Sequence, residues 1–173
     1  MKNSQLAAIF VTLTLGKLIA CGWAEDAPSS SPPLPASPAQ RPINRQATED
    51  AWIALRAGDY GLALTKANEC IDRFHGAADG IQTLLEKDRT NLPTGAASSA
   101  DRQRIDQYQI LHDVATCLLI KAWAEEHRGR KGEAIKAYAK VKKYSYARAT
   151  ERAGEPFWSP SEIASQHLSR LTQ

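Results

Sequence analysis

The feature that most constrains the fold of this chain is a segment that occurs twice, at positions 71 residues apart. AWIALRAGDYGLALTKA covers 51–67, AWAEEHRGRKGEAIKAY covers 122–138, and the two align without a gap. The matched pairs are Ala51 and Ala122, Trp52 and Trp123, Gly58 and Gly129, Gly61 and Gly132, Ala63 and Ala134, and Leu64 and Ile135. Each copy reads as a helix carrying Ala-Trp, a polar turn, and a second helix opened by Gly-x-x-Gly-x-Ala. The echo therefore predicts a helical hairpin that the chain builds twice.

These hairpin residues resemble the tetratricopeptide repeat, in which small residues let paired antiparallel helices approach closely. The matches are Ala51 and Ala122 in the first helix, Gly58 and Gly129 in the turn, Ala63 and Ala134 early in the second helix, and Tyr138 at an aromatic position from which Ala67 departs. The resemblance covers 47–75 and 115–146, and the spacing departs from the family's period of about 34 residues. It implies a degenerate two-repeat scaffold, with extended second and third helices, that holds a peptide or partner protein in a concave groove.

Helical periodicity continues outside the two hairpins and predicts an all-α domain of about five helices over 47–173, with no strand pattern. The expected helices run from Ala47 or Thr48 to Gly58, from Asp59 to about Lys87, from about Asp101 to Arg128, from about Lys131 to Lys143, and from Ser159 onward as a C-terminal cap. Thr48, Asp59 and Ser99 are the expected N-caps of the first three. Ser159 begins a capping box with proline at the first helical position.

The first 24 residues read as a secretory signal peptide, because Lys2 precedes an apolar run over 6–16 that is too short to span a bilayer. Processing has two alternatives, cleavage after Ala24 or acylation of Cys21 within a lipobox-like Leu-Ile-Ala-Cys. A Pro/Ser-rich linker follows over 25–46. The chain is therefore expected in the periplasm or cell envelope, either soluble or anchored to the outer membrane as a lipoprotein.

Cys70 and Cys117 form an even pair once Cys21 is removed or acylated. In an oxidising compartment they are candidates for a disulfide. The alternative is two small, buried, free cysteines, since cysteine often behaves as a small apolar residue. The geometry that decides between these alternatives is not contained in the sequence.

No catalytic, metal-binding or phosphate-binding motif is present, and His75, His112, His127 and His167 show no metal-ligand spacing. The sequence thus predicts a protein without enzymatic activity or cofactor. Removing 1–24 lowers the formal net charge from +3 to +1, which gives no general reason to expect nucleic-acid binding. The rival hypothesis is a small envelope enzyme acting on cell-wall or surface glycan, with carboxylates drawn from Asp113, Glu125 and Glu126.

Two surfaces are candidates for binding a protein or peptide partner. One is the basic stretch from Arg128 to Arg152, in which Arg128 and Lys131 could meet an acidic partner or anionic headgroups. The other is the aromatic set that precedes the last helix, Tyr144, Tyr146, Phe157 and Trp158. The alternatives are a solvated helix face for the cations and attachment of the last helix to the core for the aromatics. A membrane is expected to be contacted only through a lipid anchor.

Overall fold

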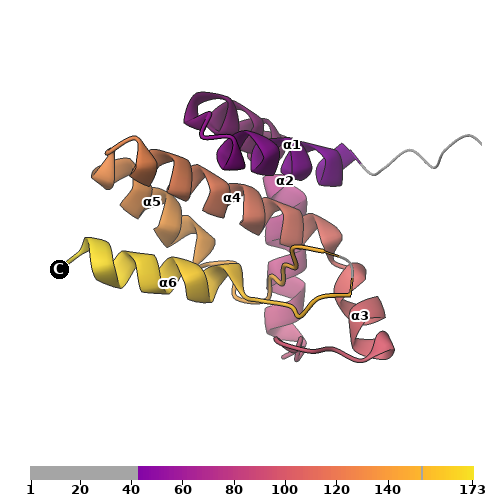
Figure 1. The fold of residues 1–173 in the computed structure, drawn as a ribbon. Helices are drawn as coiled ribbons and strands as arrows, with labels where there is room; N and C mark the ends of the chain where they lie inside the picture. Colours follow the sequence, from indigo (N-terminus) through magenta and orange to yellow (C-terminus); the bar gives the residue numbers. More distant parts are fainter. Residues whose placement is uncertain (1–42, 153) are drawn as a thin grey trace, which may run out of the picture. The chain divides into compact units, whose positions relative to one another are not determined.

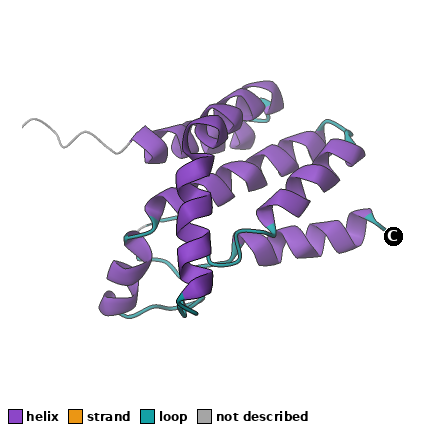
Figure 2. Cartoon of the chain, turned by 180° about the vertical axis from the view of Figure 1, so that it is seen from behind, coloured by secondary structure: helices purple, strands orange, loops and turns teal. Residues whose placement is uncertain are grey.

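The computed structural model describes residues 43–152 and 154–173, so the predicted signal peptide, Cys21 and 25–42 of the predicted linker lie outside the described residues. Helices dominate this part (Figure 1): α1 (Ile43–Arg56), α2 (Tyr60–Lys87), α3 (Ser99–Asp106), α4 (Gln109–His127), α5 (Lys131–Val141) and α6 (Pro160–Leu171). Within 43–173, position 153 aside, the connections between helices are loops and no strand is formed (Figure 2). The prediction of an all-α fold is confirmed. No helix among the described residues has the length and apolar character needed to cross a bilayer.

The two predicted hairpins are α1–α2 and α4–α5, and their turns have the same geometry. Gly58 and Gly129 adopt left-handed φ values of 76° and 73°. In the first turn, Asp59 N donates to Ala54 O and Gly58 N to Leu55 O, each at 3.0 Å. The second turn repeats this with Arg130 N to Glu125 O and Gly129 N to Glu126 O, each at 2.9 Å. Both turns are therefore Schellman motifs, in which glycine avoids the Cβ clash of the left-handed conformation.

Small residues do allow close packing in these hairpins, but the glycines and the alanines differ. Ala51, Ala122, Ala63 and Ala134 are all fully buried. A Cβ added to Gly132 would meet nothing within 4 Å. Close contact between the helices therefore depends on the alanines of the echoed segment, whereas Gly132 faces open space.

The second hairpin packs on the first through α4, which contacts both α1 and α2 (Figure 1). Helix α6 then packs against α5 and α4. Thirteen of the 19 residues of α4 are buried, so this helix has no polar face. This helix is the centre of the fold, as its wide apolar stripe in the sequence indicates.

Two predicted helix boundaries are wrong, and tertiary contacts explain both. Helix α1 starts at Ile43 rather than Ala47 or Thr48, so the last four residues of the predicted linker are helical. Asn44 Nδ2 donates to Asp113 Oδ2 at 2.6 Å, which stabilises this first turn from α4. Thr48 is no cap, because it lies inside the helix with its hydroxyl donating to Asn44 O at 3.0 Å.

The predicted helix from Asp101 to Arg128 is divided into α3 and α4, which raises the count from about five to six. The carbonyl of Ile105 accepts from Tyr108 N at 2.9 Å and bonds His112 Nε2 at 2.8 Å. A continuous helix would instead use this carbonyl for the N–H of Gln109. The side chain of His112 therefore replaces a backbone donor at the break.

The other boundaries are close to their predictions. Asp59 caps α2, where its carboxylate accepts from Leu62 N at 2.9 Å. Ser159 caps α6 by accepting from Glu162 N at 3.4 Å, with Pro160 in the first turn. Helix α3 is capped by Ser98 rather than the predicted Ser99, and α5 ends at Val141 rather than Lys143.

A disulfide joins the two hairpins. Cys70 on α2 and Cys117 on α4 are both fully buried, with their sulfur atoms 2.31 Å apart and their Cα atoms 6.5 Å apart. Of the two alternatives for this pair, the structure has the bonded one. The Thr48 hydroxyl of α1 lies 3.3 Å from Cys117 Sγ, so α1 covers the disulfide.

Candidate functional site: a cleft between the first helices of the two hairpins

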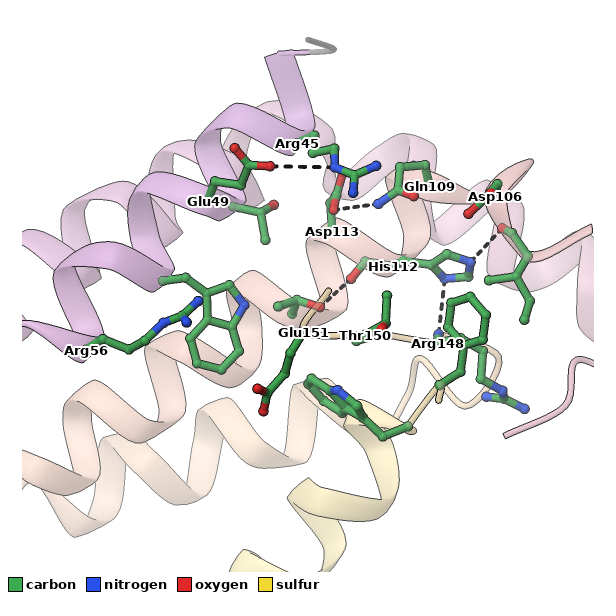
Figure 3. Close-up of a pocket in the computed structure, with 17 residues that line it drawn as sticks. Arg45, Glu49, Arg56, Asp106, Gln109, His112, Asp113, Arg148, Thr150 and Glu151 are labelled. Atoms are coloured by element: carbon green, nitrogen blue, oxygen red, sulfur yellow. Dashed lines mark hydrogen bonds and ion pairs between the residues drawn. The ribbon is translucent and has the colours of Figure 1, made fainter. Parts of the chain in front are cut away.

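A cleft of about 390 Å³ opens between α1, the α3–α4 junction and the segment that precedes α6 (Figure 3). Its lining residues follow helical spacing on α1 and α4, so each helix contributes one face. These residues are Arg45, Thr48, Glu49, Trp52 and Arg56 of α1; Ile105, Asp106, Gln109, His112, Asp113 and Thr116 of α3 and α4; and Arg148, Ala149, Thr150, Glu151, Phe157 and Trp158. The volume falls within the range of about 300–1,000 Å³ that ligand pockets occupy.

The polar centre of the cleft is the carboxylate of Asp113, which is only 5% exposed. Its Oδ2 accepts from Asn44 Nδ2 at 2.6 Å and its Oδ1 accepts from Gln109 Nε2 at 2.8 Å. Burial raises the pKa of Asp113 to about 6, while these two hydrogen bonds and the nearby charge of Arg45 oppose the shift. One buried carboxylate thus accepts hydrogen bonds from both α1 and α4.

His112 stands beside Asp113 and has a fixed tautomer. Its Nδ1 accepts from Arg148 N at 3.1 Å, so Nε2 carries the hydrogen that is donated to Ile105 O at 2.8 Å. Burial lowers the pKa of His112 to about 4, and the charge of Arg148 lowers it further, against the opposing hydrogen bond to Ile105. The imidazole is therefore neutral near pH 7, and its role is to join α4 to the two segments that flank it.

Phe157 and Trp158 form an aromatic wall of the cleft, and each is held by backbone hydrogen bonds to another loop residue. Trp158 and Ala149 exchange N–H···O bonds of 2.8 and 2.9 Å, and Phe157 and Gly95 exchange bonds of 2.9 and 2.6 Å. Arg102 also lies over the Phe157 ring, 5.1 Å from its centroid. Two short bridges therefore set Phe157 and Trp158 against the helices, although the chain around them is loop.

Arg148 supports this wall from behind. Its guanidinium donates to the carbonyl oxygens of Leu92, Pro93, Ser145 and Ala147. In Figure 3 it points away from Asp113, Gln109 and Glu151. Desolvation by burial lowers the pKa of Arg148 from its usual value. Arg148 therefore ties two loops together and does not offer its donors to the cleft.

The aromatic partner-binding candidates divide between the cleft and the core. Phe157 and Trp158 line the cleft. Tyr144 is buried, with its hydroxyl donating to Asp79 Oδ1 of α2 at 2.5 Å, and the burial raises its pKa. Tyr146 packs against the core, and its N–H donates to Gln82 Oε1 at 3.4 Å. The two tyrosines thus attach the segment after α5 to α2. Of the two aromatics that line the cleft, Phe157 is buried in the core and Trp158 is half-buried.

The basic candidates lie elsewhere. Arg128 and Lys131 are exposed at the α4–α5 turn and do not line the cleft. The two hairpin turns meet nearby, where the rings of Tyr60 and His127 stack with centroids 4.9 Å apart. The structure therefore separates the two predicted partner surfaces.

The three carboxylates of the rival hypothesis do not converge. Only Asp113 lines the cleft. Glu125 is buried, with Oε2 lying 3.4 Å from Arg130 Nε but without a hydrogen bond. Glu126 accepts from Tyr138 at 2.5 Å and lies 2.9 Å from His167 Nδ1.

Glu126 belongs to a cluster that fastens α6 to the hairpin beneath it. Arg170 of α6 donates to Glu126 Oε1 at 2.6 Å, and Trp123 Nε1 donates to His167 Nε2 at 3.3 Å. Hydrogen bonds from Tyr138, His167 and Arg170 lower the pKa of Glu126, although its desolvation opposes them as the largest single effect. His75, which bonds Ile71 O at 3.1 Å, completes the four histidines, and each has a partner. No cluster of three potential metal ligands occurs within the described residues.

Sequence reasoning missed Asn44, Gln109 and Thr116 as residues of the site. Asn44 falls within the predicted linker, and Thr116 is one polar position in an apolar run. Asp113 is the residue that indicates a polar site in the sequence. A carboxylate inside a helix that is apolar on most sides needs buried hydrogen-bond partners. Comparisons of the chain with models of protein families, with curated proteins and with solved structures found no match.

Proposed function

We propose that this chain is a non-catalytic interaction scaffold of tetratricopeptide-like type that binds a segment of a partner protein in the cleft. The observation that carries the proposal is that one face of α1 and one face of α4 line the same concavity. These are the first helices of two hairpins with the same turn geometry. A concave groove that holds a peptide or partner protein is what the resemblance to the family implies.

The chemistry of the lining supports binding. Half-buried Trp52 and Trp158 offer apolar ring surface of the kind that carries much of the energy in protein interfaces. The wall is preorganised by the pairing of Trp158 with Ala149. A partner would therefore pay little entropy for ordering the site.

The cellular setting is part of the same proposal. The signal-like sequence over 1–24 and the Cys70–Cys117 disulfide both fit an oxidising compartment. The scaffold would support a periplasmic or outer-membrane complex. Replacing Cys21 by serine tests the anchor, because loss of the protein from the membrane fraction indicates acylation and an unchanged distribution indicates a cleaved, soluble form.

Site-specific photocrosslinking in the source cells tests the scaffold. A photoreactive amino acid placed at Thr150 faces the cleft, whereas the same residue at exposed Asp72 of α2 serves as the matched control. We expect a discrete crosslinked protein from position 150 and none from position 72. Trp158→Ala should abolish the crosslink while the far-ultraviolet circular dichroism of the variant stays helical.

Crosslinks that survive Trp158→Ala would place the partner outside the cleft. Crosslinks from position 72 alone would move the binding surface to α2. Either result overturns the proposed site.

A further inference from the structure

The charges that line the cleft are unequal in number and in availability. Four carboxylates (Glu49, Asp106, Asp113 and Glu151) stand against three guanidiniums (Arg45, Arg56 and Arg148). Each guanidinium is already engaged. Arg45 Nε lies 3.6 Å from Glu49 Oε1, Arg56 lies over Trp52 at 5.3 Å, and Arg148 donates to carbonyl oxygens.

Two of the carboxylates form no ion pair or hydrogen bond with the described residues. Asp106 and Glu151 are exposed, and neither has an ion pair or a hydrogen bond of its carboxylate among the described residues. They stand on opposite sides of the cleft, Asp106 at the end of α3 and Glu151 on the segment before α6 (Figure 3). Asp113 lies at the centre with a further negative charge at neutral pH. A cation that enters the cleft therefore meets acidic groups from three directions.

The aromatic rings add a second attraction for a cation. Trp52 and Phe157 already have guanidiniums over their rings, from Arg56 and Arg102. Trp158 has no such cation among the described residues, and it is half-buried at the cleft. A tryptophan face attracts ammonium and guanidinium groups more strongly than other rings do. Trp158 also provides apolar surface for the methylene stem of a long side chain.

From this charge balance we infer that the cleft takes a lysine or arginine side chain of an extended partner segment, with the cation between Asp106, Glu151 and Trp158. The inference rests on the proposed function and gives the partner its chemistry. The basic stretch near Arg128 suggests an acidic partner, but those cations lie outside the cleft. The segment that enters the cleft is therefore inferred to be cationic. An acidic segment would instead meet a lining with one more carboxylate than guanidiniums.

A random peptide display library, selected on the folded full-length protein, tests both levels of the proposal. Peptides that no longer bind the Trp158→Ala variant depend on the cleft. We expect these peptides to share a lysine or arginine. Isothermal titration of one such synthetic peptide should give an affinity about tenfold lower for Glu151→Gln or Asp106→Asn, and the same loss when glutamine replaces the shared cation in the peptide.

The matched control is Asp72→Asn, which removes an exposed carboxylate of α2 outside the cleft and should leave the affinity unchanged. Far-ultraviolet circular dichroism and urea unfolding establish that each variant is folded. Cleft-dependent peptides without a shared cation, or equal affinities for Glu151→Gln and the native protein, overturn the cationic inference and leave the scaffold proposal standing. Failure to recover any peptide sensitive to Trp158→Ala overturns both.

Discussion

Trp52 and Trp123, which hold the same position in the two echoed segments, contact each other with ring centroids 5.4 Å apart and planes tilted by 49°. The repeated Ala-Trp pair is thus part of the contact between the hairpins as well as a mark of their similarity. Ala51 beside Trp52 is fully buried and packs in one core cluster with Ala124 of α4, so small residues line the contact between α1 and α4. The same short sequence pattern therefore contributes to packing within each hairpin and to the contact between the two hairpins.

This contact predicts coupling between the two tryptophans. Replacing Trp52 or Trp123 by alanine should lower the free energy of unfolding, and the double variant should lose less than the sum of the two. The expected coupling is about 1 kcal/mol, typical of aromatic pairs. Urea denaturation of the four proteins of the cycle measures it. Strictly additive losses would show that the rings do not stabilise each other.

Two glycines inside α2 are expected to weaken the helix without any packing benefit. A Cβ at Gly76 or Gly80 would meet nothing within 4 Å. Gly76→Ala and Gly80→Ala should each raise the free energy of unfolding by about 1 kcal/mol, because alanine has the higher helix propensity.

The control for these variants is Gly58→Ala, which forces alanine into φ 76° and should destabilise the protein by about 1–2 kcal/mol. Thermal unfolding ranks all three against the native chain. A loss of stability in Gly76→Ala would reveal a hidden contact at that position.

Asp113 and His112 should make opposite contributions to the pH dependence of stability. The pKa of Asp113 is raised from 3.8 to about 6, so between these values the folded state binds a proton that the unfolded chain releases, and stability falls as pH rises. The pKa of His112 is lowered from 6.5 to about 4, so the unfolded chain binds the extra proton and stability rises with pH. The two effects therefore oppose each other in the native protein.

Asp113→Asn should expose the histidine contribution alone. Between about pH 4 and pH 6.5 its free energy of unfolding is expected to increase by about 3 kcal/mol more than that of the native protein. Urea titrations at several pH values provide the comparison, with Asp72→Asn as the control. Parallel pH profiles for Asp113→Asn and the native chain would mean that the pKa of Asp113 is not shifted by burial.

The disulfide should contribute strongly to stability, because it closes a loop between cysteines separated by 47 residues. Loss of that constraint on the unfolded chain predicts a cost of about 2–4 kcal/mol for the variant in which Cys70 and Cys117 are both alanine. Alanine is preferred to serine, since a hydroxyl at either fully buried position would need a partner. Unfolding of the native protein with and without reductant should show the same difference. No change on reduction would argue that the thiols are not joined in solution.

The hairpin turns and most helix starts could be predicted because their causes are local. Gly58 ends α1, Asp59 caps α2, and Ser159 with Pro160 opens α6, each through contacts within about one helical turn. The echoed alanines likewise indicate their own burial. Such features depend on a few neighbouring residues, so a single sequence contains them.

The start of α1 and the break before α4 depend on distant partners. Asn44 and Asp113 are 69 residues apart in the chain, and their hydrogen bond holds the first described turn of α1 against α4. No glycine or proline marks the break between α3 and α4, where the His112 imidazole takes the carbonyl of Ile105. Helix periodicity cannot predict either of these contacts.

The candidate site could be predicted only in part, for the same reason. Phe157 and Trp158 were recognisable as an aromatic pair beside the last helix. Their exact setting depends on Gly95 and Ala149, which pair with them across loops. The loop between α2 and α3, which contains Gly95, thus helps to hold a wall of the cleft.

These two bridges also fix the order in which the cleft can be assembled. During synthesis, α1, α2 and α4 are all complete before residues 157 and 158 are added. The third wall forms only when Trp158 meets Ala149 and Phe157 meets Gly95. A nascent chain that ends before Phe157 therefore lacks one wall of the cleft, so the partner proposed for the cleft could bind only after almost the whole sequence has emerged.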